Sequence, residues 1–357
     1  DLEIDGGREW LQGEGICKAR VRVPETFIPL LPHRFDKRLF FPYGEMTGTW
    51  AICELREALE RGVELLGAEW AIWTKVTFNP FTEFVDHLFG IRQWYLEHHQ
   101  GMANIVKLML NSLYGRWGLN AEGGLYRLVD LEQADDLSRY QGATTHAVNG
   151  HLYAFMGVEV EHQPEYVNLF FAAQTAALAR LRLYQELERH GEQAVYCDTD
   201  SLITRGEVAT GDGLGEWRAE MINGKASLIA PKEYALYNRA TAPRYVVKGV
   251  PQDMAEQYIK TGVARYYRAV TIREALRNGQ RPATWIETIR GNREAFPKRY
   301  PLPPWSNPGR SWVLTRPYEV RELPLVCQGF YSEAAEIAWE QTPKLPIGIH
   351  LHQGELF

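Results

Sequence analysis

Residues 196–201 read Tyr196-Cys197-Asp198-Thr199-Asp200-Ser201 and stand between the apolar runs Ala194-Val195 and Leu202-Ile203. Apolar residues on both sides of a turn with two carboxylates predict a β-hairpin that carries Asp198 and Asp200 at its tip. Side chains two residues apart on an extended chain project to the same side, so we expect these carboxylates to lie together. Paired carboxylates repel unless a cation lies between them, and such oxygen ligands favour a divalent hard cation, foremost Mg²⁺. An Asp-x-Asp turn alone is more often a solvated hairpin tip.

A second stretch strengthens the metal-site interpretation. Residues 107–115 read Lys-Leu-Met-Leu-Asn-Ser-Leu-Tyr-Gly, which predicts a helix that ends at Gly115. Lys107, Asn111 and Tyr114 are spaced i, i+4 and i+7, so they share one face of this helix. A cation, an amide and a phenol on one face are suited to meet the phosphate, the sugar and the base of a nucleotide.

Together the two stretches resemble motifs B and C of the family B DNA polymerases, with K-x-x-x-N-S-x-Y-G at residues 107–115 and Y-x-D-T-D-S at residues 196–201. The resemblance runs from about Gly15 to about Leu323 and is closest to the protein-primed branch found in phages and linear plasmids. It implies an α+β fold with right-hand polymerase architecture: an antiparallel-sheet palm, with helical fingers and thumb.

The resemblance also implies a division of the chain into segments. We expect the N-terminal part of the palm at 1–79, the fingers helices at 80–118, an inserted hairpin at 119–163, the palm with the catalytic hairpin at 164–250, the thumb at 251–323 and a C-terminal extension at 324–357. Residues 254–279 of the thumb are expected to be helical. A plain connecting hairpin is the alternative to the insertion.

The implied reaction is nucleotidyl transfer from a dNTP to a primer 3′-hydroxyl, assisted by two Mg²⁺ ions, with Mn²⁺ as an alternative. The resemblance makes Asp200 the bridging metal ligand and Asp198 the second catalytic, metal-binding carboxylate. Lys107 and Arg92 would hold the triphosphate, and Asn111 and Tyr114 would line the pocket for the nucleotide and the nascent base pair. Instead of binding nucleotide, Arg92 could be a surface residue paired with Glu97.

Contacts with primer and template are expected from residues on and after the hairpin. Tyr196 and Thr199 would set the hairpin against the primer. The stretch Pro231-Lys232-Glu233-Tyr234 resembles the family's K-x-Y element, in which Lys and Tyr grip the primer terminus and the template strand. Lys248 follows the strand that leads to the thumb and is a further candidate for DNA binding.

Charge is distributed unevenly along the 357 residues, whose formal net charge is −6. Residues 222–321 hold 18 Lys and Arg against 7 Asp and Glu, a net charge of +11, so the remainder carries −17. A basic segment on an acidic body is typical of a surface that tracks a nucleic-acid backbone, although a solvated, arginine-rich helix face is the alternative.

The remaining sequence features concern the cellular setting. The four cysteines, Cys17, Cys53, Cys197 and Cys327, are scattered without a Cys-x-x-Cys pair, which indicates reduced thiols. The first residues lack a signal pattern, and no apolar run is long enough to span a membrane. We therefore expect a cytoplasmic protein without a membrane partner, for which the host cell of a virus or mobile element is one setting.

One family element is missing from the sequence: motif A, D-x-x-S-L-Y-P, which supplies another metal-binding aspartate. We expect activity to need an N-terminal portion that carries it, and a separate polymerase/exonuclease chain or a terminal protein are alternative partners besides template-primer DNA and dNTP. Two other functions stay open. One is a DNA-binding remnant without catalysis, and the other is a glycosyltransferase, because an Asp-x-Asp turn can hold a metal with a nucleotide-sugar.

Overall fold

The computed structural model describes most of the chain. Described are residues 7–118, 126–134, 136, 138, 143–148, 151–157, 165–271, 274–275, 285–291, 298–302, 315–327 and 347–349. The chain divides into two compact units, of which the first comprises Asp1–Tyr114, Leu169–Val246 and Glu294–Phe357, and the second comprises Gly115–Asn168 and Val247–Arg293.

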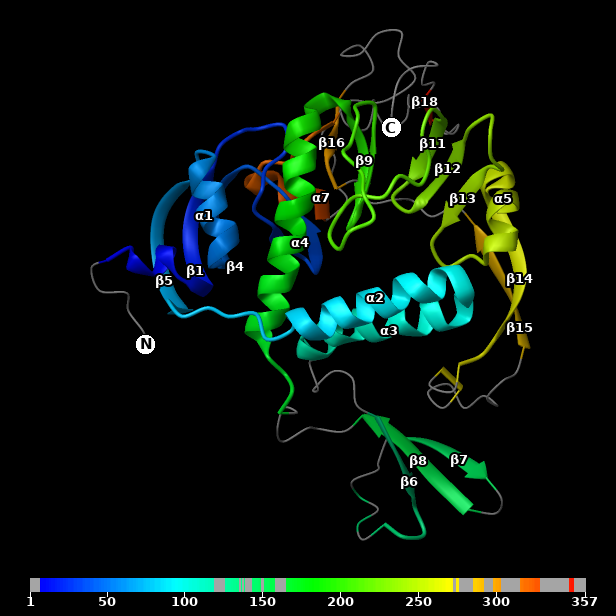
Figure 1. Cartoon of the computed structure of the whole chain (residues 1–357). Coiled ribbons are helices and arrows are strands. Elements are labelled where there is room, and N and C mark those ends of the chain that lie inside the picture. Colours follow the sequence, from blue (N-terminus) through cyan, green and yellow to red (C-terminus); the bar gives the residue numbers. More distant parts are fainter. Residues whose placement is uncertain are drawn as a thin grey trace. The chain divides into compact units, whose positions relative to one another are not determined.

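A three-stranded antiparallel sheet begins the first unit (Figure 1). Its order is β4-β1-β5, with β1 at Glu14–Val23, β4 at Gly44–Ala51 and β5 at Glu64–Thr74. The strict alternation along β1 places one set of side chains in the core, namely Cys17, Ala19, Val21 and Val23. Basic residues of the opposite face pair with acidic residues of the neighbouring strands, as in the Lys18–Glu69 ion pair.

Two helices cover the apolar face of this sheet. Helix α1 spans Ile52–Glu60, and the 22-residue helix α4 spans Leu169–His190. Both pack on β1 and on each other, and α4 also contacts β10 of the Asp-x-Asp hairpin. Ala177 and Leu181 of α4 join the core cluster, whereas Leu169 at its start is exposed. The long helix therefore links the first sheet with the hairpin.

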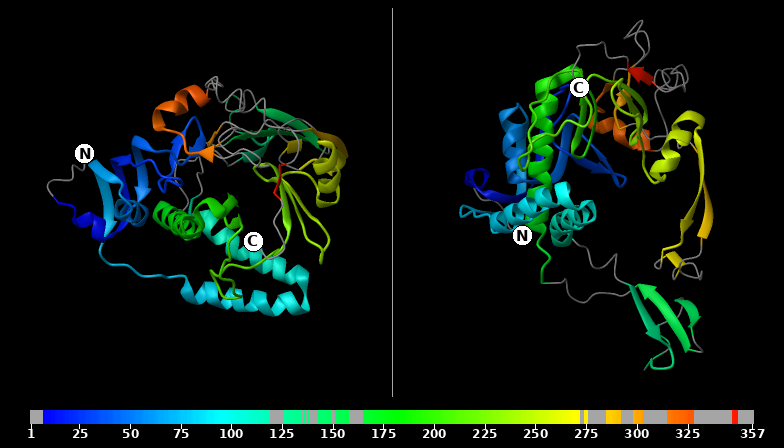
Figure 2. Two further views of the ribbon diagram at one scale, coloured as in Figure 1. Left: turned by 90° about the horizontal axis from the view of Figure 1, so that it is seen from above. Right: turned by 45° about the vertical axis from the view of Figure 1, so that its right-hand side comes forward.

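Two further helices, α2 at Thr82–His98 and α3 at Gln100–Trp117, lie side by side (Figures 1 and 2). The expectation that Gly115 ends the second helix is wrong, because α3 continues through Gly115 to Trp117. A glycine in a helix costs only about 1 kcal/mol relative to alanine, which the helix tolerates. The register of the helix before Gly115 is unaffected, so the shared face of Lys107 and Asn111 is retained.

The hairpin consists of β9 at Ala194–Asp198 and β10 at Ser201–Thr204. It packs on a second sheet of order β13-β12-β11-β18, through a cluster of Ile203 with Ala226 and Leu236. The strands of that sheet are β11 at Lys225–Ala230, β12 at Glu233–Tyr237, β13 at Arg244–Val247 and β18 at Ile347–Ile349.

Short elements complete the first unit. They are η1 at Glu9–Gln12, β2 at His33–Phe35, β3 at Arg38–Phe40, η4 at Gly191–Gln193, β16 at Tyr300–Pro301, β17 at Thr315–Arg316, η6 at Val320–Glu322 and α7 at Leu323–Cys327. Phe40 of β3 packs with Tyr318, Leu323 and Val326 in one buried cluster. Part of the segment expected to be thumb, residues 315–323, therefore packs on the first unit.

The second unit contains a three-stranded antiparallel sheet of order β6-β8-β7, with strands Tyr126–Asp130, His151–Gly157 and Thr144–Val148. It lies within the segment expected to be an inserted hairpin. The same unit contains α5 at Gln252–Thr261 and a ribbon of β14 at Val263–Ala269 with β15 at Trp285–Gly291.

The expectation of helix throughout residues 254–279 is wrong at β14. Gly262 ends α5 with a left-handed backbone, φ 74°, which a residue without a side chain adopts without strain. The following run of β-branched and aromatic residues then pairs as a strand. Arg273 and Arg277, which belong to the segment expected to be helical, lie outside the described residues.

All four cysteines are free thiols. No helix in the described part of the chain combines the length and apolar character that a membrane crossing requires.

Candidate functional site

The Asp-x-Asp turn is tighter than an extended chain. Ser201 pairs with Asp198 across the hairpin, so Thr199 and Asp200 alone form the loop. Thr199 has a left-handed backbone, φ 55°, and the Asp200 N–H donates to the Asp198 carbonyl oxygen at 2.6 Å. The expected extended backbone from Asp198 to Asp200 is therefore wrong, because Asp200 belongs to the turn. Left-handed conformations of β-branched residues are strained and concentrate at functional sites.

Hydroxyl groups hold this turn in place. The Thr199 hydroxyl donates to Asp198 Oδ1 at 3.1 Å, and the Ser201 hydroxyl donates to the Asp198 carbonyl oxygen at 3.1 Å. The Asp198 side chain is half-buried, whereas Asp200 is exposed. One carboxylate is thus fixed by the protein, and the other faces solvent.

The K-x-Y element lies against the same turn. Lys232 Nζ is 3.1 Å from Asp198 Oδ1, and the Lys232 backbone N–H donates to the Tyr196 hydroxyl at 2.9 Å. Lys232 also has a left-handed backbone, φ 64°, in the turn that joins β11 to β12. The rings of Tyr196 and Tyr234 lie 5.4 Å apart between centroids. Four residues predicted from the sequence therefore form one cluster with Asp198, namely Tyr196, Thr199, Lys232 and Tyr234.

Burial shapes the two phenols of this cluster. It raises the pKa of Tyr196 to about 12, although the hydrogen bond from Lys232 opposes the rise. Burial also raises the pKa of Tyr234, and the nearby Arg244 guanidinium opposes that change. Both phenols are consequently neutral donors or acceptors at physiological pH.

The other predicted residues lie on the helix pair. Lys107 and Asn111 are exposed, and neither has a hydrogen bond or ion pair within the described part of the chain. Arg92 Nε on α2 is buried without a hydrogen-bond partner, and among the described residues its guanidinium forms no ion pair with Glu97. The structure thus does not support the pairing alternative, and it leaves three polar groups available to a ligand.

No hydrogen bond or ion pair among the described residues joins these helix groups to Asp198 or Asp200. Their meeting around a nucleotide therefore stays a prediction. Lys248 belongs to the second unit, so its contact with DNA stays a prediction as well.

Sequence analysis missed one polar pair near the site. Glu54 of α1 is fully buried, and Arg180 of α4 donates to both of its oxygens at 2.6 and 2.9 Å. Burial raises the pKa of Glu54, and the Arg180 guanidinium opposes the rise. The signal was Arg180 directly after the apolar run 176–179 and before Leu181.

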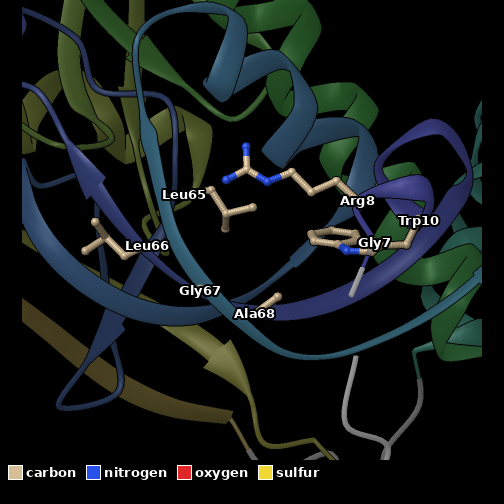
Figure 3. Close-up of a pocket in the computed structure, with 7 residues that line it drawn as sticks. All are labelled: Gly7, Arg8, Trp10, Leu65, Leu66, Gly67 and Ala68. Carbon is tan, nitrogen blue, oxygen red and sulfur yellow. The ribbon is translucent and has the colours of Figure 1, made fainter. Parts of the chain in front are cut away.

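Two other features do not coincide with the predicted site. A pocket of about 300 Å³ near the start of the chain is lined by Gly7, Arg8, Trp10 and residues 65–68, as Figure 3 shows. In the second unit, His151 Nδ1 lies 3.0 Å from Glu132 and 3.6 Å from Asp130.

The fold is that of a polymerase. The chain is similar to the Phi29 DNA polymerase solved with primer-template DNA, with a TM-score of 0.54 and 15% identity over 81% of this chain and 53% of that one. The orthorhombic crystal form of Phi29 DNA polymerase gives a TM-score of 0.51 with 15% identity, covering 78% of this chain and 51% of that one. The predicted α+β polymerase architecture is confirmed.

Sequence comparison then defines the family. Residues 8–202 match the model of DNA polymerase type B, organellar and viral, and the chain belongs to that family. It is 30% identical over 192 residues to the DNA-directed DNA polymerase of Enterobacteria phage PRD1. This match covers 49% of this chain and 32% of the phage protein. It is 25% identical over 275 residues to a probable DNA polymerase of Neurospora intermedia, 70% of this chain and 27% of that protein.

The chain thus spans about a third or less of these curated relatives. The predicted membership in the family B polymerases is confirmed, and it excludes the glycosyltransferase alternative.

Proposed function

We propose that this chain supplies the primer-holding and nucleotide-holding part of a template-directed DNA polymerase. The observation that carries the proposal is the contact of two motifs distant in sequence, in which Lys232 of K-x-Y lies 3.1 Å from Asp198 of motif C. A hairpin turn without this function has no need of a strained threonine and a strained lysine at one carboxylate.

The side chains fit a hard divalent cation. Asp198 and Asp200 offer carboxylate oxygens, which suit Mg²⁺ and also Mn²⁺. The ammonium group of Lys232 already lies against Asp198 Oδ1, so that oxygen is accessible to a positive charge. When bound, the metal would supply charge neutralisation and activation of the primer hydroxyl. The hairpin's own task is to present both carboxylates at the primer end.

The helix pair would hold the triphosphate. Arg92 and Lys107 have no carboxylate partner in the described structure, so their charges are available to phosphate oxygens. Asn111 and Tyr114 would line the pocket for sugar and base from the same face of α3. Fixed cations at the triphosphate stabilise the charge that develops as pyrophosphate leaves.

Primer and template would contact the hairpin and the adjoining sheet. Tyr196 and Thr199 would set the turn against the primer, while Lys232 and Tyr234 would grip its terminus. Lys248 would contact the DNA beyond β13. A nucleic-acid phosphate near Asp198 would also draw the Lys232 ammonium away from the carboxylate, which frees that oxygen for a metal.

The proposal includes a requirement for a further segment. Motif A is not found in the sequence, and the curated relatives are several times longer than the matched part. We infer that a segment with D-x-x-S-L-Y-P completes the metal site, either in the same polypeptide or as a separate chain. The resemblance to the protein-primed branch makes a protein primer a further candidate partner.

Primer extension tests the proposal directly. The chain would be joined to, or mixed with, the segment encoded immediately upstream of Asp1, and assayed with primer-template DNA, dNTPs and Mg²⁺. We expect extension that requires both parts and that Asp200→Asn abolishes. Salt-dependent DNA binding with no extension by the completed protein would instead favour a non-catalytic remnant.

A further inference from the structure

Gly206, just beyond the Asp-x-Asp hairpin, approaches the end of α4 very closely. A Cβ atom on Gly206 would lie 2.5 Å from His190 Nδ1 and 2.6 Å from Gln193 Oε1. Gln193 is exposed, so its side chain can turn away, but the imidazole ring cannot be avoided in this way. Ordinary contacts between heavy atoms begin at about 3.5 Å, so any side chain at this position would move the ring or the chain by about 1 Å.

His190 is enclosed by its surroundings. It is the last residue of α4, and only 8% of its surface is exposed. Its Nε2 faces Glu186 Oε2 at 3.7 Å, one helical turn earlier, and Glu186 is itself 1% exposed. Arg182 and Arg189 form ion pairs with the Glu186 carboxylate at 3.6 and 3.2 Å. Because a close-packed interior resists displacement, the imidazole keeps its Nδ1 edge toward Gly206.

The open end of the hairpin is attached at the same point. The Gln193 carbonyl oxygen accepts from the Thr204 hydroxyl at 3.2 Å and from the Arg205 N–H at 3.0 Å. The Gly206 N–H donates to Thr204 Oγ1 at 3.1 Å, and Thr204 is fully buried opposite Ala194 of β9. Both strands of the hairpin therefore leave the end of α4 from a fixed position, and the Asp-x-Asp turn lies at their other end.

We propose that His190 and Gly206 are positioning residues for the candidate metal-binding carboxylates Asp198 and Asp200. Their contact sets where the hairpin leaves α4, and the short, paired strands carry that position to the turn. They act through the hairpin and not as metal ligands. Metal ligands have to be held within about 0.5 Å of their working geometry, which is less than the displacement that a side chain at position 206 would cause. The inference rests on the proposed function, because the placement of the turn has a chemical consequence only if a metal binds there.

Mn²⁺ binding by the full chain tests this role, with the free ion followed by electron paramagnetic resonance. Gly206→Ala should weaken the Asp198-dependent binding about tenfold, the lower end of what residues behind metal ligands contribute. Adding His190→Ala removes the ring that the new methyl group meets, so the affinity should return to that of His190→Ala alone, close to the wild-type value. Urea unfolding measured in parallel separates the roles, since a merely structural contact would lower the unfolding midpoint and leave the affinity of the folded protein unchanged.

Gly67→Ala is the matched control. Gly67 lies in β5, and apart from its chain neighbours no heavy atom of the described residues lies within 4 Å of the place that a Cβ would take. The substitution adds the same methyl group without an overlap, so the Mn²⁺ affinity should stay at the wild-type value. Asp198→Asn identifies the binding that is measured, because it should remove the part that depends on the turn.

The inference is overturned if wild type binds Mn²⁺ through Asp198 while Gly206→Ala keeps its affinity, or if Gly67→Ala loses as much. It is equally overturned if the double variant does not recover, in Mn²⁺ affinity or, should Gly206→Ala fail to fold, in folding. A wild-type chain without Asp198-dependent Mn²⁺ binding would defeat the proposed metal site itself, which distinguishes the two failures.

Discussion

The Lys232 ammonium and a bound metal ion would compete for the Asp198 carboxylate. Replacing Lys232 by methionine removes the first of these charges and so shows its effect on metal binding. The lysine ammonium lies 3.1 Å from Asp198 Oδ1, with side-chain exposures of 40% and 26% for the two partners. The gross Coulomb attraction is about 5 kcal/mol at an effective dielectric constant of about 20. For a pair this exposed, solvent screening, desolvation and side-chain ordering reduce the net value to about 0.5–1 kcal/mol.

A metal at Asp198 must overcome this pairing, so Lys232→Met should bind Mn²⁺ about 2–5-fold more tightly, which is the net ion-pair energy expressed as an equilibrium constant. The assay is titration of the full chain with Mn²⁺ without DNA, with the free ion followed by electron paramagnetic resonance. Primer-template affinity should fall in the same variant, because a phosphate contact is lost. The two effects have opposite signs, which general destabilisation cannot produce.

Lys225→Met is the matched control, because Lys225 is an exposed lysine of β11 with no ion pair among the described residues. It should leave Mn²⁺ affinity unchanged. The gain from Lys232→Met should disappear when Asp198→Asn is added. Equal or weaker Mn²⁺ binding by Lys232→Met, or an equal gain in the control, would refute the reasoning.

Three further predictions concern single positions. Asp200→Asn keeps the shape of the turn but removes a metal ligand, so primer extension by the completed polymerase should fall by orders of magnitude while duplex binding persists; unchanged extension would exclude the assignment. Arg180→Met leaves the fully buried Glu54 unpaired and should lower the free energy of unfolding in urea at pH 7 by about 3–5 kcal/mol. This loss should shrink as the pH is lowered, because Glu54 is then protonated. A loss independent of pH would contradict the buried charge. Folding raises the pKa of Tyr196, so the stabilising contribution of its neutral phenol is complete below about pH 10 and is lost as the pH rises toward about 12. Over that window the free energy of unfolding of the wild type should fall by about 1–2 kcal/mol relative to that of Tyr196→Phe. Parallel curves of unfolding free energy against pH for the two proteins would refute this prediction.

The sequence predicted the local structure of the candidate site where short-range chemistry determines that structure. The apolar flanks of residues 196–201 specify a hairpin, and the spacing of Lys107 and Asn111 specifies a shared helix face. The family resemblance assigned both the hairpin and K-x-Y to the primer, and the contact of Lys232 with Asp198 agrees with that assignment. These features depend on few residues, each with a strong local preference.

Features that depend on tertiary contacts were not predicted. Thr199 adopts a left-handed backbone only because hydroxyl and backbone hydrogen bonds fix the turn. Glu54 was not recognised as buried, because its partner Arg180 lies on another helix. The strand β14 was taken for helix, although Gly262 and the aromatic run after it were usable signals. The contacts of Arg299 with Phe27 and Thr315 were not predictable, because these residues are remote from it in sequence.

The central claim is that the Asp-x-Asp turn and the face of α3 act on one metal-bound triphosphate. Photolabelling of the completed polymerase tests it most directly, with a dNTP that carries an aryl azide on its γ-phosphate, in the presence of Mg²⁺ and primer-template. The account predicts labelled peptides from α3 around Lys107 and from α2 around Arg92, and loss of this labelling in Asp200→Asn. Labelling confined to other segments, or labelling of α3 that is indifferent to Asp200, would contradict it.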